Sequence, residues 1–329
     1  MHATSTQNET FRLDLLLKKE CVNMFNYSAI IMNASKNNDL GNLNSAGAYS
    51  KNSVIINCAL NVPLLLISII GNSLVLAAIL KNPLLRSPST VFLCSLAVSD
   101  LLVGFVVQPV YIADELKPGS SLSHADRVFS LSVCGVSLCT MTATSVDRFL
   151  ALHYHMRYPN LMTEERAVYT LATLWVINIL LSSFGFWKEN IYFFIMAAGT
   201  AICLLISTFS YIRIYLIVRR HQLQIHTQQQ AVQSLNAEQN LNMVRSKKSA
   251  INTFIYYICM ILCYSPASVL SLTEAILPKR SPWAWILAST VVYMNSSINP
   301  FLYCWRTYEI RMAVLNTLRT ILFKQTGRN

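Results

Sequence analysis

Seven long apolar stretches dominate this 329-residue sequence and constrain its fold more than any other feature. They lie near residues 54–80, 90–112, 124–152, 167–187, 191–219, 250–277 and 283–304. An α-helix needs about 20 mostly apolar residues to cross a bilayer, because its backbone N–H and C=O groups must be satisfied within the segment. Charged residues make up only 12% of the chain, against about 25% in soluble domains. We therefore predict an all-α membrane protein, a seven-transmembrane helix bundle.

The segments outside the membrane indicate which way the chain is inserted. Residues 1–53 are polar and contain three N-glycosylation motifs, at Asn8, Asn26 and Asn33. We expect them to form an extracellular, glycosylated tail. Seven spans then place the C-terminus in the cytoplasm, and 16 of the 26 Lys and Arg residues fall on that side, as the positive-inside rule requires. The net charge of +11 thus reflects orientation in a plasma membrane, and no nucleic-acid partner is expected.

The chain is expected to have three parts. The tail of residues 1–53 precedes a membrane domain of residues 54–304. In residues 305–329, apolar side chains alternate with basic ones after the last span, which predicts an amphipathic helix on the inner leaflet and a short cytoplasmic tail. Of nine cysteines, only Cys21 lies in a plainly polar region, so no structural disulfide is expected.

Each predicted span carries a short motif. In order, these are Gly71-Asn72, Leu96-Ala97-Val98-Ser99-Asp100, Asp147-Arg148-Phe149, Trp175, Tyr211, Cys263-Tyr264-Ser265-Pro266 and Asn299-Pro300-Phe301-Leu302-Tyr303. One such motif alone is weak evidence, but all seven at compatible spacings on seven apolar spans form a specific pattern. On these residues the chain resembles the rhodopsin-like (class A) G-protein-coupled receptors over residues 54–322. The resemblance implies a receptor that activates a heterotrimeric G protein and catalyses no reaction.

Asp100 is the one acidic residue in the interior of a predicted span, where an ionised carboxylate is costly and usually faces the bundle interior. By the resemblance its neighbours are Ser137, Asn295, Ser296 and Asn299, which all carry oxygen atoms. Such oxygen ligands suit a hard cation, and the matching site of the family holds an allosteric sodium ion. A buried hydrogen-bonded network without an ion is the alternative.

The resemblance also implies an activation switch. Its residues are Asp147, Arg148, Tyr211, Tyr264, Pro266, Pro300 and Tyr303. In the family, the Arg is held by its Asp neighbour until activation, when two tyrosines matching Tyr211 and Tyr303 meet it. Each proline removes one backbone hydrogen bond and permits a kink, so Pro266 provides a hinge for movement of the sixth span.

Several positions depart from the usual family pattern. Ser123 stands where most members have a disulfide-forming Cys, Cys203 replaces a Pro, and Tyr264 and Met260 replace a Trp and a Phe. The Ser123 and Cys203 departures, with a very short second outer loop and the segment 154–163, are similar to the melanocortin-like branch, which groups with adenosine, cannabinoid and lysophospholipid receptors. The Tyr264 and Met260 changes affect the usual trigger mechanism and leave the fold unchanged. Ser246 supplies no acidic partner for Arg148, which predicts appreciable basal activity.

The ligand pocket is expected among polar and aromatic residues near the outer mouth. These are Tyr111, Asp114, Asp126, Arg127, Ser130, Glu274 and Tyr293. Ser130 replaces the Asp of amine receptors, and Tyr293 replaces the retinal-binding Lys of opsins, so neither of these ligand types is expected. Solvated loop positions and ordinary packing are the alternative interpretations. A peptide, a lipid and a small polar molecule all remain open as the extracellular ligand.

An ion-coupled transporter or channel that uses Asp100 is the competing function. It would need a continuous polar path through the membrane, whereas Met141, Tyr256 and Met260 place apolar side chains below Asp100.

Overall fold

The structure is a computed structural model, which describes residues 51–85, 87–117, 122–154, 157–184, 189–231, 236–277 and 281–326. The predicted glycosylation sites Asn8, Asn26 and Asn33 lie outside these residues. The chain divides into two compact units, Met1–Val62 and Pro63–Asn329. The contacts discussed below belong to the second unit.

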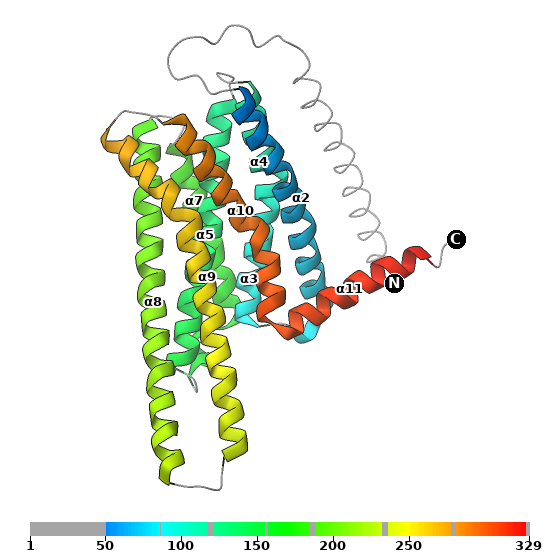
Figure 1. Cartoon of the computed structure of the whole chain (residues 1–329), viewed down its shortest axis with the longest axis vertical. Helices are drawn as coiled ribbons and strands as arrows, with labels where there is room; N and C mark the ends of the chain where they lie inside the picture. Colours follow the sequence, from blue (N-terminus) through cyan, green and yellow to red (C-terminus); the bar gives the residue numbers. More distant parts are fainter. Residues whose placement is uncertain are drawn as a thin grey trace. The chain divides into compact units, whose positions relative to one another are not determined.

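The described parts of the chain are helical throughout. The elements are α2 (Lys51–Lys81), η1 (Pro83–Leu85), α3 (Pro88–Leu102), η2 (Val103–Val107), α4 (Gln108–Leu116), α5 (Leu122–Tyr154), α6 (Tyr158–Leu161), α7 (Glu164–Ser183), α8 (Glu189–Ala231), α9 (Asn236–Ile276), α10 (Pro282–Arg306) and α11 (Tyr308–Thr326). In the second unit, α3, α5, α7, α8, α9 and α10 run alongside one another, and α11 turns away from the end of α10 (Figure 1). The predicted all-α bundle is confirmed.

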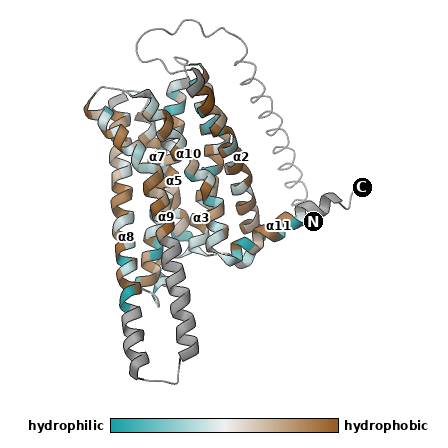
Figure 2. Ribbon diagram, viewed as in Figure 1, coloured by the Kyte–Doolittle hydropathy of each residue, from teal (hydrophilic) through white to brown (hydrophobic). Residues whose placement is uncertain are grey.

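Six segments of the described residues are long and apolar enough to cross a membrane. They are Val54–Lys81, Pro88–Leu116, Ser123–Tyr154, Glu164–Ser183, Ile191–Arg220 and Phe254–Ile276. Helix α10 coincides with the seventh apolar stretch of the sequence. Apolar residues occupy much of the length of these helices (Figure 2). Their outer faces expose large apolar side chains such as Tyr169, Leu205 and Leu262, as lipid contact requires.

Local sequence signals explain where two of the helices begin. The Ser87 hydroxyl accepts a hydrogen bond from the backbone N–H of Thr90 at the start of α3, where Pro88 occupies the first turn. The Thr163 hydroxyl caps α7 in the same way, and Glu164 and Glu165 in the first turn complement its dipole.

The second span is not one regular α-helix. A five-residue π-helical segment, η2, joins α3 to α4. Pro109 follows directly in the first turn of α4, and a proline within a helix removes one hydrogen bond and displaces the preceding turn. The wider π-turn absorbs this displacement, so the span stays continuous from Pro88 to Leu116.

Helix α11 occupies the region in which the sequence predicts an amphipathic helix. Ile310, Ala313 and Val314 are buried on one face, whereas Tyr308 and Leu315 are exposed. This arrangement gives the helix one face that packs and one face that remains available to its surroundings.

The close approach of α2 to α10 depends on a glycine. A Cβ atom added to Gly71 would lie 2.8 Å from Cγ of Pro300, and a proline ring cannot rotate away. Gly71-Asn72 therefore permits the α10 segment that carries Pro300 to pack directly against the backbone of α2.

We predict that Gly71→Ala lowers the free energy of unfolding by about 1–3 kcal/mol, the usual cost of overpacking a tight contact. Gly199→Ala is the matched control, because a Cβ at Gly199 meets no atom within 4 Å. That variant should be neutral or up to about 1 kcal/mol more stable, because alanine is the better helix former. Thermal unfolding of the detergent-purified variants tests both expectations, and equal melting temperatures would contradict the packing argument.

Candidate functional site

Asp100 lies at the centre of a buried polar cluster between α3, α5 and α10. Its carboxylate accepts a hydrogen bond from the Ser137 hydroxyl (3.3 Å) and another from the Asn299 amide (2.8 Å). Ser296 is a further hydrogen-bond partner. The side chains of Asp100, Ser137 and Asn299 are fully buried, and Ser296 is 2% exposed. Four of the five residues expected around the ion thus lie together.

A second layer of hydrogen bonds holds this cluster in place. The Ser68 hydroxyl donates to the backbone carbonyl of Asp100 (2.8 Å). The Asn72 amide donates to the carbonyls of Ser68 (2.9 Å) and Ser296 (3.1 Å). Asn72 therefore links α2 to α10 beside the carboxylate, which gives the first-span motif a structural role.

Two amide oxygens of this region have no hydrogen-bond partner in the structure. They are Oδ1 of Asn72 and Oδ1 of Asn299, and both atoms are buried. A buried amide oxygen without a donor is costly, and a cation with oxygen ligands would satisfy such atoms. The donor set of one carboxylate, two hydroxyls and amide oxygens fits a small hard cation such as Na⁺.

Asn295, the fifth residue expected around the ion, makes its hydrogen bond outside the Asp100 cluster. Its amide donates to the sulfur of Met141 (3.6 Å). Because Met141 lines the cavity below the cluster, Asn295 connects α10 to that cavity.

Asp147 is hydrogen-bonded to the first turn of α3 and to α6. One carboxylate oxygen accepts a hydrogen bond from the Tyr158 hydroxyl of α6 (2.7 Å), and the other accepts one from the Ser89 hydroxyl of α3 (2.9 Å). The Asp147 side chain is fully buried. Each oxygen therefore accepts a hydrogen bond from a neutral hydroxyl group.

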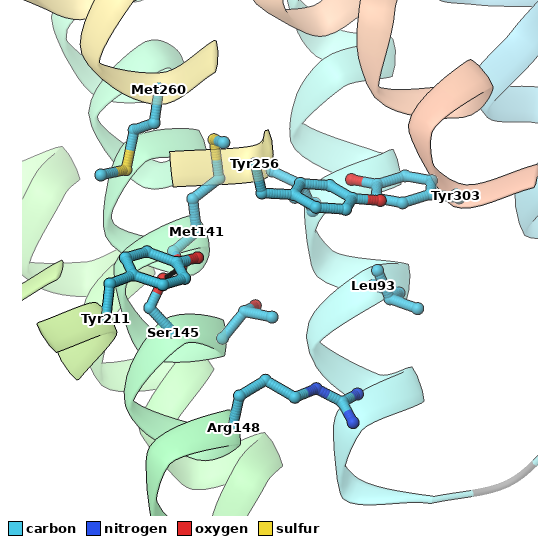
Figure 3. Close-up of a pocket in the computed structure, with 10 residues that line it drawn as sticks. Leu93, Met141, Ser145, Arg148, Tyr211, Tyr256, Met260 and Tyr303 are labelled. Carbon is cyan, nitrogen blue, oxygen red and sulfur yellow. Dashed lines mark hydrogen bonds between the residues drawn. The ribbon is translucent and has the colours of Figure 1, made fainter. Parts of the chain in front are cut away.

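A cavity of about 20 Å³ lies between α3, α5, α8, α9 and α10. Its walls include Leu93, Leu96, Met141, Thr144, Ser145, Arg148, Tyr211, Tyr256, Met260 and Tyr303. Figure 3 shows Tyr211 and Tyr303 above the Arg148 side chain, on opposite sides of this space. The Tyr211 hydroxyl accepts a hydrogen bond from Ser145 (3.0 Å). The structure thus places three of the predicted switch residues around one cavity.

Three further switch residues, Tyr264, Pro266 and Pro300, belong to α9 and α10. Pro266 is inside α9 and Pro300 inside α10. The Tyr264 hydroxyl approaches the backbone carbonyl of Cys134 in α5 at 3.5 Å, and its side chain is 5% exposed. Tyr264 therefore bridges α9 and α5, where the family usually has Trp.

Four of the predicted ligand-pocket residues form one connected group. The Ser130 hydroxyl donates to Asp126 (3.2 Å) and lies 3.2 Å from the Tyr293 hydroxyl. Because Ser130 has a single hydroxyl proton, Tyr293 is the donor in the second bond. Tyr293 also contacts Tyr111 edge to face at 5.2 Å. This chain joins α4, α5 and α10 near their outer ends.

The remaining predicted pocket residues have separate local contacts. Asp114 accepts a hydrogen bond from Ser123 (2.8 Å). Ser123 stands where most family members have a disulfide-forming cysteine. Arg127 contacts His124 (3.2 Å), and Glu274 accepts a hydrogen bond from the indole N–H of Trp285. The Asp114 contact links α4 to α5, and the Glu274 contact links α9 to α10.

The cysteines of the described segments are all free thiols. Two of them, Cys139 of α5 and Cys203 of α8, have their sulfur atoms 3.8 Å apart. Cys21 lies outside the described residues.

Comparison with known proteins agrees with this geometry. The model of the family "7 transmembrane receptor (rhodopsin family)" matches residues 71–187 and 182–303. This chain belongs to that family of membrane receptors, as the seven motifs predicted.

Several melanocortin receptors are similar over most of their length. Melanocortin receptor 4 of Danio rerio is 27% identical over 293 residues, which cover 81% of this chain and 84% of the relative. Melanocortin receptor 5 of Rattus norvegicus is 28% identical over 303 residues, covering 86% and 90%. Melanocortin receptor 3 of Homo sapiens is 28% identical over 286 residues, covering 80% and 84%. The expected likeness to the melanocortin branch is confirmed.

Sequence reasoning missed several residues of this site. Ser89 and Tyr158 lie 58 and 11 residues from Asp147 along the chain, and neither belongs to one of the seven span motifs. Only the presence of hydroxyl groups near the ends of neighbouring segments could have indicated them.

Tyr158→Phe should destabilise the protein by about 1 kcal/mol, because it removes a hydrogen bond to the Asp147 carboxylate. The effect stays this small because Tyr158 itself is only partly buried. Partial burial and the bond to Asp147 raise the pKa of Tyr158 to about 12. A raised pKa means that the contribution is complete below the ordinary value of about 10 and is lost as pH rises toward 12. Melting temperatures of both proteins from pH 6 to pH 9 should therefore differ by a constant amount. A difference that vanishes within this range would contradict the assignment.

Proposed function

We propose that this protein is a plasma-membrane receptor that converts binding of an extracellular ligand into activation of a heterotrimeric G protein, without catalysing a reaction itself. The N-terminus faces outward and the C-terminus inward. The observation that carries this proposal is the cavity that brings Arg148 together with Tyr211 and Tyr303. The membership of the rhodopsin family supports it.

The position of Arg148 favours a readily activated receptor. The two oxygens of Asp147 accept hydrogen bonds from Ser89 and Tyr158, which anchor its carboxylate to α3 and α6. Arg148 already lines the same cavity as the two switch tyrosines. Appreciable basal signalling follows from this arrangement.

A transporter or channel is the less suitable function. Below Asp100, the cavity wall includes the apolar side chains Leu96, Met141 and Met260. Met141 and Met260 are 5% and 1% exposed, so buried apolar side chains lie where an ion would need polar ones.

The ligand is proposed to bind near the Asp126–Ser130–Tyr293 group. This group joins two helices of the bundle through hydroxyl bonds, so a ligand that displaces one bond can alter how α5 and α10 pack. The curated relatives are named as melanocortin receptors, which makes a peptide of that type the first ligand to test.

Arg148→Ala should reduce basal second-messenger output, measured as cyclic AMP and Ca²⁺ in transfected cells, to that of cells without the receptor. The reason is that Arg148 is the cationic side chain of the inner cavity. Lys81→Ala is the control, because it removes an exposed positive charge from the end of α2. Equal output of Arg148→Ala and the wild type, at matched surface expression, would contradict the proposed function.

The Asp100 cluster is proposed to bind a sodium ion that stabilises one packing of the bundle. The carboxylate and the oxygen atoms of Ser137, Ser296 and Asn299 would hold the ion, which supplies a positive charge to the buried carboxylate. No proton or electron transfer is assigned to this site.

Replacing choline chloride by NaCl at constant ionic strength should raise the melting temperature of the purified protein. At a free sodium concentration ten times Kd, the expected stabilisation is about 1.4 kcal/mol. Asp100→Asn should abolish the dependence on sodium. Ser99→Ala should retain it, because the Ser99 hydroxyl donates to the carbonyl of Leu96. A sodium effect that survives Asp100→Asn would place the ion elsewhere.

A further inference from the structure

Two consecutive tyrosines of α9 contact the two switch tyrosines of the neighbouring helices. Consecutive residues of an α-helix point about 100° apart, so Tyr256 and Tyr257 face different partners. Tyr256 stacks on Tyr303 of α10, with ring centroids 5.9 Å apart and planes inclined by 17°. Tyr257 packs on Tyr211 of α8, with centroids 4.6 Å apart and planes inclined by 38°.

Three of these four rings are buried, and Tyr257 is partly buried. Tyr256 and Tyr211 are each 8% exposed, and Tyr303 is 1% exposed. The Tyr257 hydroxyl lies 2.6 Å from the hydroxyl of Thr208, which is also on α8. Figure 3 shows the Tyr256 and Tyr303 rings next to each other with nearly parallel planes. Each switch tyrosine thus has one α9 tyrosine against its ring.

Both contacts border the cavity that contains Arg148. Tyr256, Tyr303 and Tyr211 line it together with Arg148, and Ser145 donates a hydrogen bond to the Tyr211 hydroxyl. The Tyr256 ring therefore limits how far Tyr303 can turn out of the cavity. The Tyr257 ring limits the same movement of Tyr211.

We propose that Tyr256 and Tyr257 are positioning residues that hold Tyr303 and Tyr211 beside Arg148, in the arrangement that activates the G protein. This inference rests on the proposed function and adds to it a determinant of basal activity that none of the seven motifs contains. The pair acts through the switch tyrosines and needs no contact with the G protein or the ligand.

The size of the effect follows from the strength of an aromatic pair. Loss of one buried aromatic contact should lower the ratio of active to inactive receptor by about two- to tenfold. Tyr256→Leu removes the ring and keeps an apolar side chain, so basal output should fall within this range. Tyr256→Phe retains the ring and should retain at least half of the wild-type output.

The signalling experiment compares these variants at matched surface expression. Leu262→Ala is the control on the same helix, because Leu262 is 63% exposed on the outer face, and it should signal like the wild type. Tyr257→Leu tests the second contact and should also reduce output. If Tyr256→Leu does not reach the surface, Tyr256→Met removes the ring with a more adaptable side chain. Wild-type output from both Leu variants, or loss of output in Tyr256→Phe equal to that in Tyr256→Leu, would overturn the proposal.

A second measurement separates this proposal from the proposed function. Hydrogen–deuterium exchange of residues 299–306 in lipid nanodiscs reports whether Tyr303 is held, whether or not a G protein is present. Exchange should rise in Tyr256→Leu and remain at the wild-type rate in Tyr256→Phe and Leu262→Ala. Unchanged exchange in Tyr256→Leu would overturn the positioning role even if Arg148→Ala abolishes signalling. The other case is that exchange rises in Tyr256→Leu but the wild type signals no more than Arg148→Ala. That result would support the positioning role of Tyr256 and contradict the proposed function.

Discussion

A bilayer offers no water to hydrogen-bond the backbone, and the rest of this structure depends on that constraint. Each spanning segment must satisfy its own N–H and C=O groups, so the apolar stretches become helices. Lipid tails are as apolar as the side chains that face them, which leaves little hydrophobic force to pair one helix with another. The helices are instead joined by close packing, as between Gly71 and Pro300, and by polar contacts in the interior.

The polar contacts are concentrated at the level where the helices converge. Asp100 cannot face lipid as a carboxylate, and it is surrounded by hydroxyl and amide groups of α5 and α10. Asn72 adds α2 to the same network through two carbonyl groups. Because these bonds are directional, a change at one helix alters the geometry available to the others. Such a network can transmit a small shift near the outer end of the bundle toward the inner cavity.

The inner half of the bundle uses aromatic rings where the middle uses hydrogen bonds. Four tyrosines from three helices pack in two pairs across the seams between α9 and its neighbours. Rings can slide or separate at modest cost, whereas buried polar atoms need new partners when they part. An aromatic layer can thus readjust its packing while the polar middle stays connected. Met141 and Met260 separate the two layers and add flexible packing between them.

Much of this protein could be predicted from its sequence. The length of the apolar stretches determined the helices, and the spacing of the motifs indicated the receptor family. Asp100 was recognisable as a site residue because a charged side chain within a membrane span is costly. The π-helical segment was not foreseen, although Pro109 was its visible cause. The partners of Asp147 and the pairing of Tyr256 with Tyr303 were decided by the tertiary structure alone. These contacts join residues 58, 11 and 47 positions apart, and periodicity reveals which face of a helix is buried but not which neighbour covers it. The neighbour follows only from the rotation and crossing of whole helices, which depend on all their contacts together.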